Sequence, residues 1–201
     1  VLLLLLLLIL LLYIVLIVRY IFGWKIIPKK LQQTDNLETV SVVIPMRNEE
    51  KEIKRLLKNF KTQNYPPNKL EFILVNDHSN DNTLDLLQES TEDNIKIIDL
   101  EEGKFGKKDA VVAACNIAVG DIILVSDADC SFTNNWVKVM VNYFVNNDIK
   151  LVSGPVAFNT KKGIFQSFQA LEFISLIGVG AGAIGIKNPI FCNGANMAYR
   201  K

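Results

Sequence analysis

Short apolar runs alternate along this chain with segments whose apolar residues recur at helical spacing. Five runs rich in Val, Ile and Leu predict β-strands, at residues 39–45, 69–77, 95–100, 121–127 and 149–158. Four segments between these runs predict helices, at residues 49–60, 83–90, 107–120 and 134–147. Strands that alternate with helices form βαβ units. The pattern therefore predicts an α/β fold with a mostly parallel sheet flanked by helices.

A longer apolar run opens the chain. Residues 1–18 carry no charge, and at about 1.5 Å per residue they span roughly 27 Å, close to the hydrocarbon thickness of a bilayer. Aromatic residues and three lysines follow before the first acid. This order predicts a transmembrane helix at 1–24 and a basic linker at 25–37, with the rest of the chain on the cytoplasmic side. The alternative, a cleaved signal peptide, is disfavoured by the length of the run and the lack of a small-residue cleavage site.

A second apolar stretch, residues 163–186, also contains Gln166, Gln169 and Glu172. We expect a helix that passes into a flexible small-residue segment at the rim of the site and touches the membrane interface. A second full span is the less favoured alternative. The "GVGAGAIG" segment within it mimics a dinucleotide-binding fingerprint, but it does not lie between a first strand and its helix, so we reject that function.

Composition excludes several classes of protein. The 201 residues are 50% hydrophobic, which suffices for one domain with a sizeable core. The formal net charge is +1, so neither a nucleic acid nor another strong polyion is expected as a partner. The cysteines, Cys115, Cys130 and Cys192, are too widely spaced for a disulfide framework or a zinc site, and they favour a reducing compartment.

Polar clusters follow three of the predicted strands. The first strand ends in Pro45-Met46-Arg47-Asn48-Glu49, the second in Asn76-Asp77-His78-Ser79, and the fourth in Asp127-Ala128-Asp129. Ligands of parallel α/β sheets bind beyond the carboxyl ends of the strands. The sequence therefore predicts that these clusters meet at one edge and form a binding site.

Asp127 and Asp129 are two carboxylates that point to the same side of an extended chain. Two close carboxylates repel each other, and a hard divalent cation removes that repulsion. Mg²⁺ or Mn²⁺ takes one or two protein carboxylates and shares its other positions with water and phosphate oxygens. The D-x-D pattern after an apolar strand thus favours a metal and diphosphate site over a solvated capping loop.

Other polar residues near these clusters have simpler alternatives. Asp77 is placed to accept hydrogen bonds from a base or a ribose, whereas Asp81 is expected to cap a helix. His78 is expected to be a turn residue rather than a general base. Lys104 and Lys107 precede a predicted helix, where a cation suits a phosphate, although a solvated basic loop is the alternative.

Four segments stand out for their order and spacing: "VSVVIPMRNEE", "ILVNDHSNDNT", "GKKDAVVAACNIAVGDIILVSDADC" and "FCNGANMAYRK". Together they resemble the family 2 glycosyltransferases of GT-A (Rossmann-like) fold, and the resemblance covers residues 38–201. The resemblance is strongest to the membrane-anchored bacterial type. It implies an inverting transfer from a UDP- or GDP-sugar to a lipid-linked or glycan acceptor at the cytoplasmic face of the inner membrane.

The resemblance also implies roles for single residues. Those matching donor-nucleotide contacts are Pro45, Arg47, Glu49, Asp77, Lys107, Asp127 and Ala128. Those matching the sugar and acceptor loop are Gly194, Ala195 and Asn196. Asp129, with Asp127, matches the ligand pair for Mg²⁺ or Mn²⁺.

Two features depart from the family pattern. Asn76 stands where the family usually has Asp, which puts base recognition in doubt. The family's general base lies downstream of "GANMAYR", so we expect it after Lys201 and expect the GT-A domain, residues 38–201, to be incomplete at its C-terminus. A membrane-tethered nucleotide-sugar-binding module without activity is therefore one alternative. A nucleotidyltransferase is another, disfavoured because the loop after the first strand lacks glycine.

Overall fold

The computed structural model describes residues 1–27, 37–90, 92–158 and 163–201. They form two compact units. The sheet unit comprises the described residues of Leu31–Gly154 and Gly194–Lys201, and the helical unit those of Val1–Lys30 and Pro155–Asn193. Most of the predicted linker, residues 28–36, lies outside the described residues.

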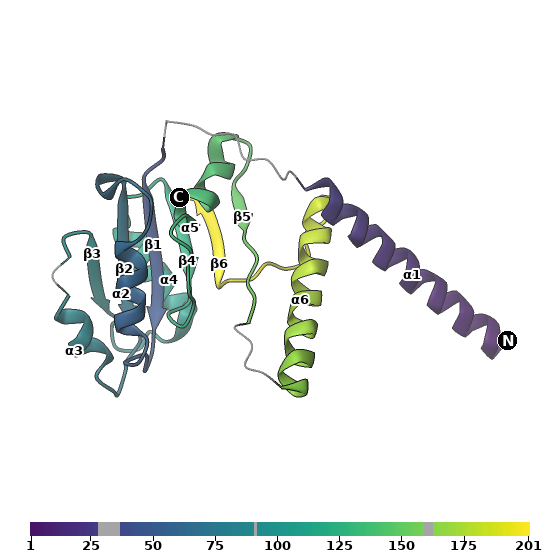
Figure 1. The fold of residues 1–201 in the computed structure, drawn as a ribbon, viewed down its shortest axis with the longest axis horizontal. Helices are drawn as coiled ribbons and strands as arrows, with labels where there is room; N and C mark the ends of the chain where they lie inside the picture. Colours follow the sequence, from purple (N-terminus) through teal and green to yellow (C-terminus); the bar gives the residue numbers. More distant parts are fainter. Residues whose placement is uncertain (28–36, 91, 159–162) are drawn as a thin grey trace. The chain divides into compact units, whose positions relative to one another are not determined.

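The sheet has six strands in the order β3-β2-β1-β4-β6-β5 (Figure 1). The strands are β1 (Val40–Met46), β2 (Leu70–Asn76), β3 (Ile95–Asp99), β4 (Ile122–Ser126), β5 (Leu151–Ser153) and β6 (Asn196–Arg200). β1 pairs in parallel with β2 and β4, and β2 pairs in parallel with β3. β6 is antiparallel to both β4 and β5. The predicted α/β fold with a mostly parallel sheet is confirmed, and β6 is a strand that the periodicity did not indicate.

Helices cover both faces of the sheet, as the apolar strands predict. One core lies under α2 (Ile53–Lys61), α3 (Thr83–Gln88), α5 (Trp136–Val141) and the 3₁₀ segment η2 (Asn142–Val145). The other core lies under α4 (Gly106–Ile117), whose alanines pack on the strands. Figure 1 shows α2 and α4 on opposite sides of the sheet.

Two predicted boundaries were wrong. The helix predicted at 107–120 ends at Ile117, because Ala118 is extended and the chain must turn into β4. A side chain at Gly120 would overlap the backbone of β1, so this glycine permits a close approach of two strands rather than capping a helix. The strand predicted at 149–158 is shorter, Leu151–Ser153, because only these residues pair with β6.

A buried polar network fixes the start of β1 against β2. Glu71 is 8% exposed, and its carboxylate accepts hydrogen bonds from the Ser41 hydroxyl and, at 2.7 Å, from the Val119 N–H. Lys96 on β3 lies 2.7 Å from the other carboxylate oxygen. Ser41 Oγ in turn accepts the Gly120 N–H at 2.8 Å. This network joins three strands to the turn before β4.

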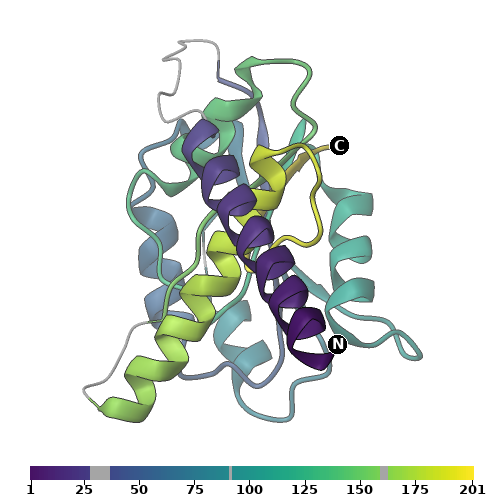
Figure 2. The ribbon, with the colours of Figure 1, turned by 90° about the vertical axis from the view of Figure 1, so that its right-hand side faces the viewer.

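The helical unit contains α1 (Leu2–Ile26) and α6 (Ile164–Gly185). α6 is one unbroken helix, as Figure 1 shows, so the prediction of a flexible small-residue segment was wrong. In Figure 2, α1 passes in front of α6. Its glycines instead permit close packing. A Cβ on Gly182 would overlap the carbonyl of Tyr20, and a Cβ on Gly185 would overlap that of Gly23. By length and composition, both helices could cross a membrane.

The Glu71 network generates a stability prediction. Glu71→Ala leaves the Ser41 hydroxyl and the Val119 N–H without their buried acceptor, so we expect a loss of about 3 kcal/mol. For a chain of this size that lowers the melting temperature by roughly 6–12 °C. Thermal melts of the full chain in detergent test this. The control, Glu92→Ala, removes an exposed ion pair with Lys61 and should cost about 0.5 kcal/mol or less.

The same carboxylate predicts a pH dependence. Burial opposes its ionisation, but hydrogen bonds from Lys96, Ser41 and the Val119 N–H outweigh burial and lower the pKa of Glu71. The stabilisation is therefore complete above the unfolded pKa of about 4.3 and is lost as the pH falls through the lower folded pKa. We expect the stability difference between the wild type and Glu71→Gln to narrow only below about pH 4. A difference that already narrows between pH 7 and 5 would contradict this.

Candidate active site

The loops after β1 and β2 are bound to each other. The Asn48 N–H donates to Ser79 Oγ at 3.0 Å, and the Asn80 N–H donates back to Asn48 Oδ1 at 2.7 Å. The Glu49 N–H donates to Thr83 Oγ1 at 2.7 Å. The structure thus brings the first two predicted polar clusters together.

Asp77 lies between these loops and the start of α4. Its N–H donates to the Met46 carbonyl at 2.8 Å, and its Oδ2 accepts the Gly106 N–H at 2.9 Å. Asp77 is 5% exposed, and its Oδ1 has no hydrogen-bond partner among the described residues. A buried acceptor without a partner is costly. Asp77 is therefore prepared to accept a donor from a ligand.

Asn76 has a structural reason to be an amide. Its Nδ2 donates to Asp99 Oδ1 at 2.7 Å, and its Oδ1 accepts the Ser79 N–H at 3.3 Å. An aspartate at this position would place two carboxylates against each other. Asn76, the departure from the family pattern, thus helps to hold the turn over residues 76–79, which contains Asp77.

Lys107 joins α4 to the third polar cluster. Its ammonium group forms an ion pair with Asp127 and donates to the Gly194 carbonyl at 3.2 Å. Both side chains of the pair are partly exposed, so a ligand can reach them. Of the two possibilities for this lysine, the structure favours a role in the site over a solvated loop.

The segment before β6 completes this edge. Ser126 Oγ donates to the Ala195 carbonyl at 2.6 Å, which holds the segment beside the end of β4. Asn196 lies in β6, and its Oδ1 accepts the Trp136 indole N–H at 3.0 Å. The predicted sugar and acceptor residues therefore lie beside the Lys107–Asp127 pair, and the carbonyl of Gly194 contacts that pair.

Negative charge gathers around the D-x-D segment. Ala128 is buried, whereas Asp129 is exposed. Burial, followed by the negative charges of Asp129 and of three further acids that include Asp127, raises the pKa of Glu49. The acids thus repel one another across the loops, which is the situation that a bound cation relieves.

The donor set fits Mg²⁺ or Mn²⁺. Among the described residues, no group of three or more His, Cys, Asp or Glu side chains could hold a metal ion by itself. Asp127 and Asp129 offer two hard oxygen ligands at a partly exposed position. Such a site suits an ion that completes its coordination with water and diphosphate oxygens.

Several other predicted residues lie around this edge. Pro45 is near the end of β1, and Arg47 is exposed just beyond it. His78 Nε2 lies 3.0 Å from the Lys104 carbonyl oxygen, and its ring packs at a tilt against Phe105 with the ring centroids 4.7 Å apart, which agrees with a turn residue. Lys104 pairs with Glu101 at 2.7 Å on the surface, as the solvated-loop alternative expects.

Sequence reasoning missed two contributors to this edge. The Gly106 N–H donates to Asp77, and the backbone of Gly106 has a φ of +81°, which favours glycine. The Gly–Lys pair at 106–107 was the sequence pattern that could have indicated this contact. Arg55 contacts the D-x-D loop across 73 positions in sequence, which no local pattern indicates.

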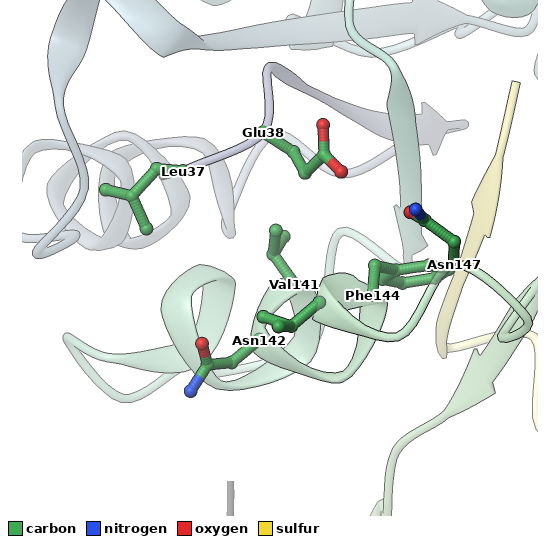
Figure 3. Close-up of a pocket in the computed structure, with 7 residues that line it drawn as sticks. Leu37, Glu38, Val141, Asn142, Phe144 and Asn147 are labelled. Atoms are coloured by element: carbon green, nitrogen blue, oxygen red, sulfur yellow. The ribbon is translucent and has the colours of Figure 1, made fainter. Parts of the chain in front are cut away.

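A pocket of about 190 Å³ lies elsewhere (Figure 3). Glu38 and Asn147 are among its lining residues. Glu38 precedes β1, so the pocket lies at the opposite end of that strand from Asp77 and Asp127. It is not part of the candidate active site.

Comparisons with known proteins agree with this geometry. The chain is 36% identical over 159 residues to the probable glycosyltransferase YdaM of Bacillus subtilis, covering 74% of this chain and 37% of that protein. It is 33% identical over 147 residues to the poly-beta-1,6-N-acetyl-D-glucosamine synthase of Staphylococcus aureus, covering 72% and 35%. The chain thus spans little more than a third of the length of these relatives.

The fold also matches a solved structure, mannosyltransferase PcManGT from Pyrobaculum calidifontis in complex with GDP-Man and Mn²⁺. The TM-score is 0.68 at 22% identity, covering 92% of this chain and 52% of that one. This likeness shows the GT-A fold. Residues 41–201 match the family model for glycosyl transferase family 2. The chain therefore belongs to glycosyl transferase family 2.

Proposed function

We propose that this chain carries the donor site of an inverting glycosyltransferase. It would move a sugar from a UDP- or GDP-sugar to a lipid-linked or glycan acceptor at the cytoplasmic face of the membrane. The observation that carries the proposal is the convergence of Asp77, Lys107 and the Asp127–Asp129 pair at one sheet edge. Two similar proteins support the proposal. One is a sequence relative named as a poly-beta-1,6-N-acetyl-D-glucosamine synthase, and the other is a mannosyltransferase of similar fold solved in complex with GDP-Man.

The nucleoside would lie against Asp77. Its unpartnered Oδ1 can accept an N–H from the base or a hydroxyl from the ribose, while the Gly106 N–H holds the other oxygen. Uracil and guanine each carry an N–H group that could donate the missing hydrogen bond to Asp77 Oδ1. Pro45, Arg47 and Glu49 would line the same loop, as the family resemblance implies.

The diphosphate would lie between Lys107 and the D-x-D segment. Mg²⁺ or Mn²⁺ held by Asp129 and Asp127 supplies charge stabilisation to the leaving diphosphate. Lys107 would exchange its contact with Asp127 for a diphosphate oxygen and add a second positive charge. Ala128, which is buried and lies between the two acids in sequence, would line the same site, as the family resemblance implies.

The transfer would be a single displacement. The acceptor hydroxyl oxygen bonds to the anomeric carbon as the bond from that carbon to the diphosphate oxygen breaks, so the configuration inverts. The hydroxyl proton passes to a carboxylate expected after Lys201. Gly194, Ala195 and Asn196 would border the sugar, because Gly194 contacts Lys107.

Of the two long apolar helices, α1 would attach this chain to the membrane. Its residues are exposed and apolar along most of its length, and it is long enough to span a bilayer. α6 is also long and apolar enough to span a bilayer, but its position in the chain argues against a membrane crossing. It connects β5 to β6, which are hydrogen-bonded neighbours in one sheet. A single crossing by α6 would place these two strands on opposite sides of the membrane.

The metal site generates the first prediction for this function. Asp129→Ala removes one of two carboxylate ligands, so we expect Mn²⁺-dependent binding of UDP or GDP to weaken by about tenfold or more. Titration calorimetry on the full chain in detergent, with and without Mn²⁺, measures this. The control is Asp148→Ala, an exposed acid outside the site. Mn²⁺-dependent binding that survives in Asp129→Ala would refute this assignment.

The base site generates a second prediction. Asp77→Asn keeps the shape but removes the charge that accepts a donor, so nucleotide affinity should fall by about 10- to 100-fold. Binding of inorganic pyrophosphate with Mn²⁺ should not change, because Lys107 and the D-x-D segment are untouched. The same calorimetry compares UDP, GDP and pyrophosphate. Equal losses for nucleotide and pyrophosphate would show that Asp77 supports the fold rather than the base.

A further inference from the structure

Arg55, in the first turn of α2, contacts the D-x-D loop. One guanidinium nitrogen donates to Ser131 Oγ, and another lies 3.4 Å from the carbonyl oxygen of Ala128. Ala128 is the residue between Asp127 and Asp129. The guanidinium thus reaches the backbone of the D-x-D segment itself.

Glu52 holds this guanidinium in place. Its Oε2 lies 2.8 Å from Arg55 Nε and 2.6 Å from Arg55 NH2. Both side chains are about two-thirds buried, at 34% and 35% exposed, so the pair is less solvated than an ordinary surface ion pair. The planar guanidinium can bind Glu52 on one side and the loop on the other at the same time.

The second half of the loop is also attached to the end of α2. The Asn64 N–H donates to the Asn134 carbonyl at 2.6 Å, and Gln63 Nε2 donates to the Thr133 carbonyl at 3.0 Å. Residues 127–135 contain no helix or strand, so these attachments determine where the loop lies. Of the attachments between the loop and the α2 segment, the one made by Arg55 is nearest to the two acids.

Asp129 depends on this attachment more than Asp127 does. Asp127 is held by Lys107, whereas no side-chain hydrogen bond is found for Asp129 within the described ranges. The position of the Asp129 carboxylate is therefore set by its backbone. That backbone is fixed on one side by β4 and on the other by the contacts of Arg55 with Ala128 and Ser131. Between them, the Cys130 N–H donates to the Asp127 carbonyl at 3.2 Å and closes the turn.

We infer that Arg55 is a positioning residue, which holds the Ala128–Ser131 backbone so that Asp129 stands ready to bind the divalent cation with Asp127. This inference rests on the proposed function for its metal and nucleotide, but the loop contacts themselves do not. A lysine could supply the charge, but its single ammonium could not bind Glu52, the Ser131 hydroxyl and the Ala128 carbonyl in this planar arrangement.

Amide hydrogen exchange of the full chain in detergent, without nucleotide or metal, tests the positioning directly. In Arg55→Gln we expect residues 127–135 to exchange at least about tenfold faster, because their anchor is lost, while β1 and β2 stay protected. The matched controls are Lys54→Gln and Lys58→Gln, which remove exposed cations from the same helix. Unchanged exchange of the loop in Arg55→Gln would overturn the inference.

Calorimetry then separates position from charge. We expect Arg55→Gln to weaken Mn²⁺-dependent UDP or GDP binding by about 10-fold and to leave metal-free binding unchanged. Arg55→Lys should recover little of this loss. Full recovery in Arg55→Lys, or equal losses with and without Mn²⁺, would show that Arg55 acts by charge alone. If the wild type binds neither nucleotide, the proposed function fails, and the exchange experiment still decides the role of Arg55.

Discussion

The parallel pairing of β1 with β2 and β4 is the constraint on which the rest of the structure depends. Val40 is the register partner of both Leu70 and Ile122, so β1, β2 and β4 begin side by side in the sheet. Their carboxyl ends, and the loops that follow, consequently meet at one edge. The Glu71 network fixes this register at the start of the strands, because Ser41 and Glu71 are direct register partners. A shift by one residue would separate them and leave the buried Glu71 carboxylate without the Ser41 hydroxyl.

This arrangement concentrates charge at the edge. Burial raises the pKa of Glu49, and the negative charges of nearby acids from different loops raise it further. Two cations offset them within the described part of the sheet unit. Lys107 pairs with Asp127, and Arg55 lies against the loop that carries Asp129. Lys107 and Arg55 thus offset only part of the negative charge, and the Lys107–Asp127 pair is partly exposed, so that a cation and a diphosphate can replace the lysine contact.

The helical unit shows a different use of glycine. Gly182 and Gly185 of α6 allow its backbone to approach α1 near Tyr20 and Gly23, where larger side chains would collide. This contact involves the C-terminal ends of both helices, beyond the uncharged residues 1–18. The apolar, glycine-rich composition of α6 therefore has a packing reason that does not require it to cross a membrane.

The sequence by itself determined the strands and helices of the α/β core, the α1 helix and the three polar clusters. These depend on local periodicity and on the position of charges after apolar runs, which neighbouring residues specify. Only the tertiary structure decided that β6 enters between β4 and β5, that Asn76 faces Asp99, and that Arg55 reaches the D-x-D loop. The two side-chain contacts join residues 23 and 73 positions apart. These contacts depend on how the strands and helices pack against one another. Residues that meet in this way show no periodic pattern along the sequence.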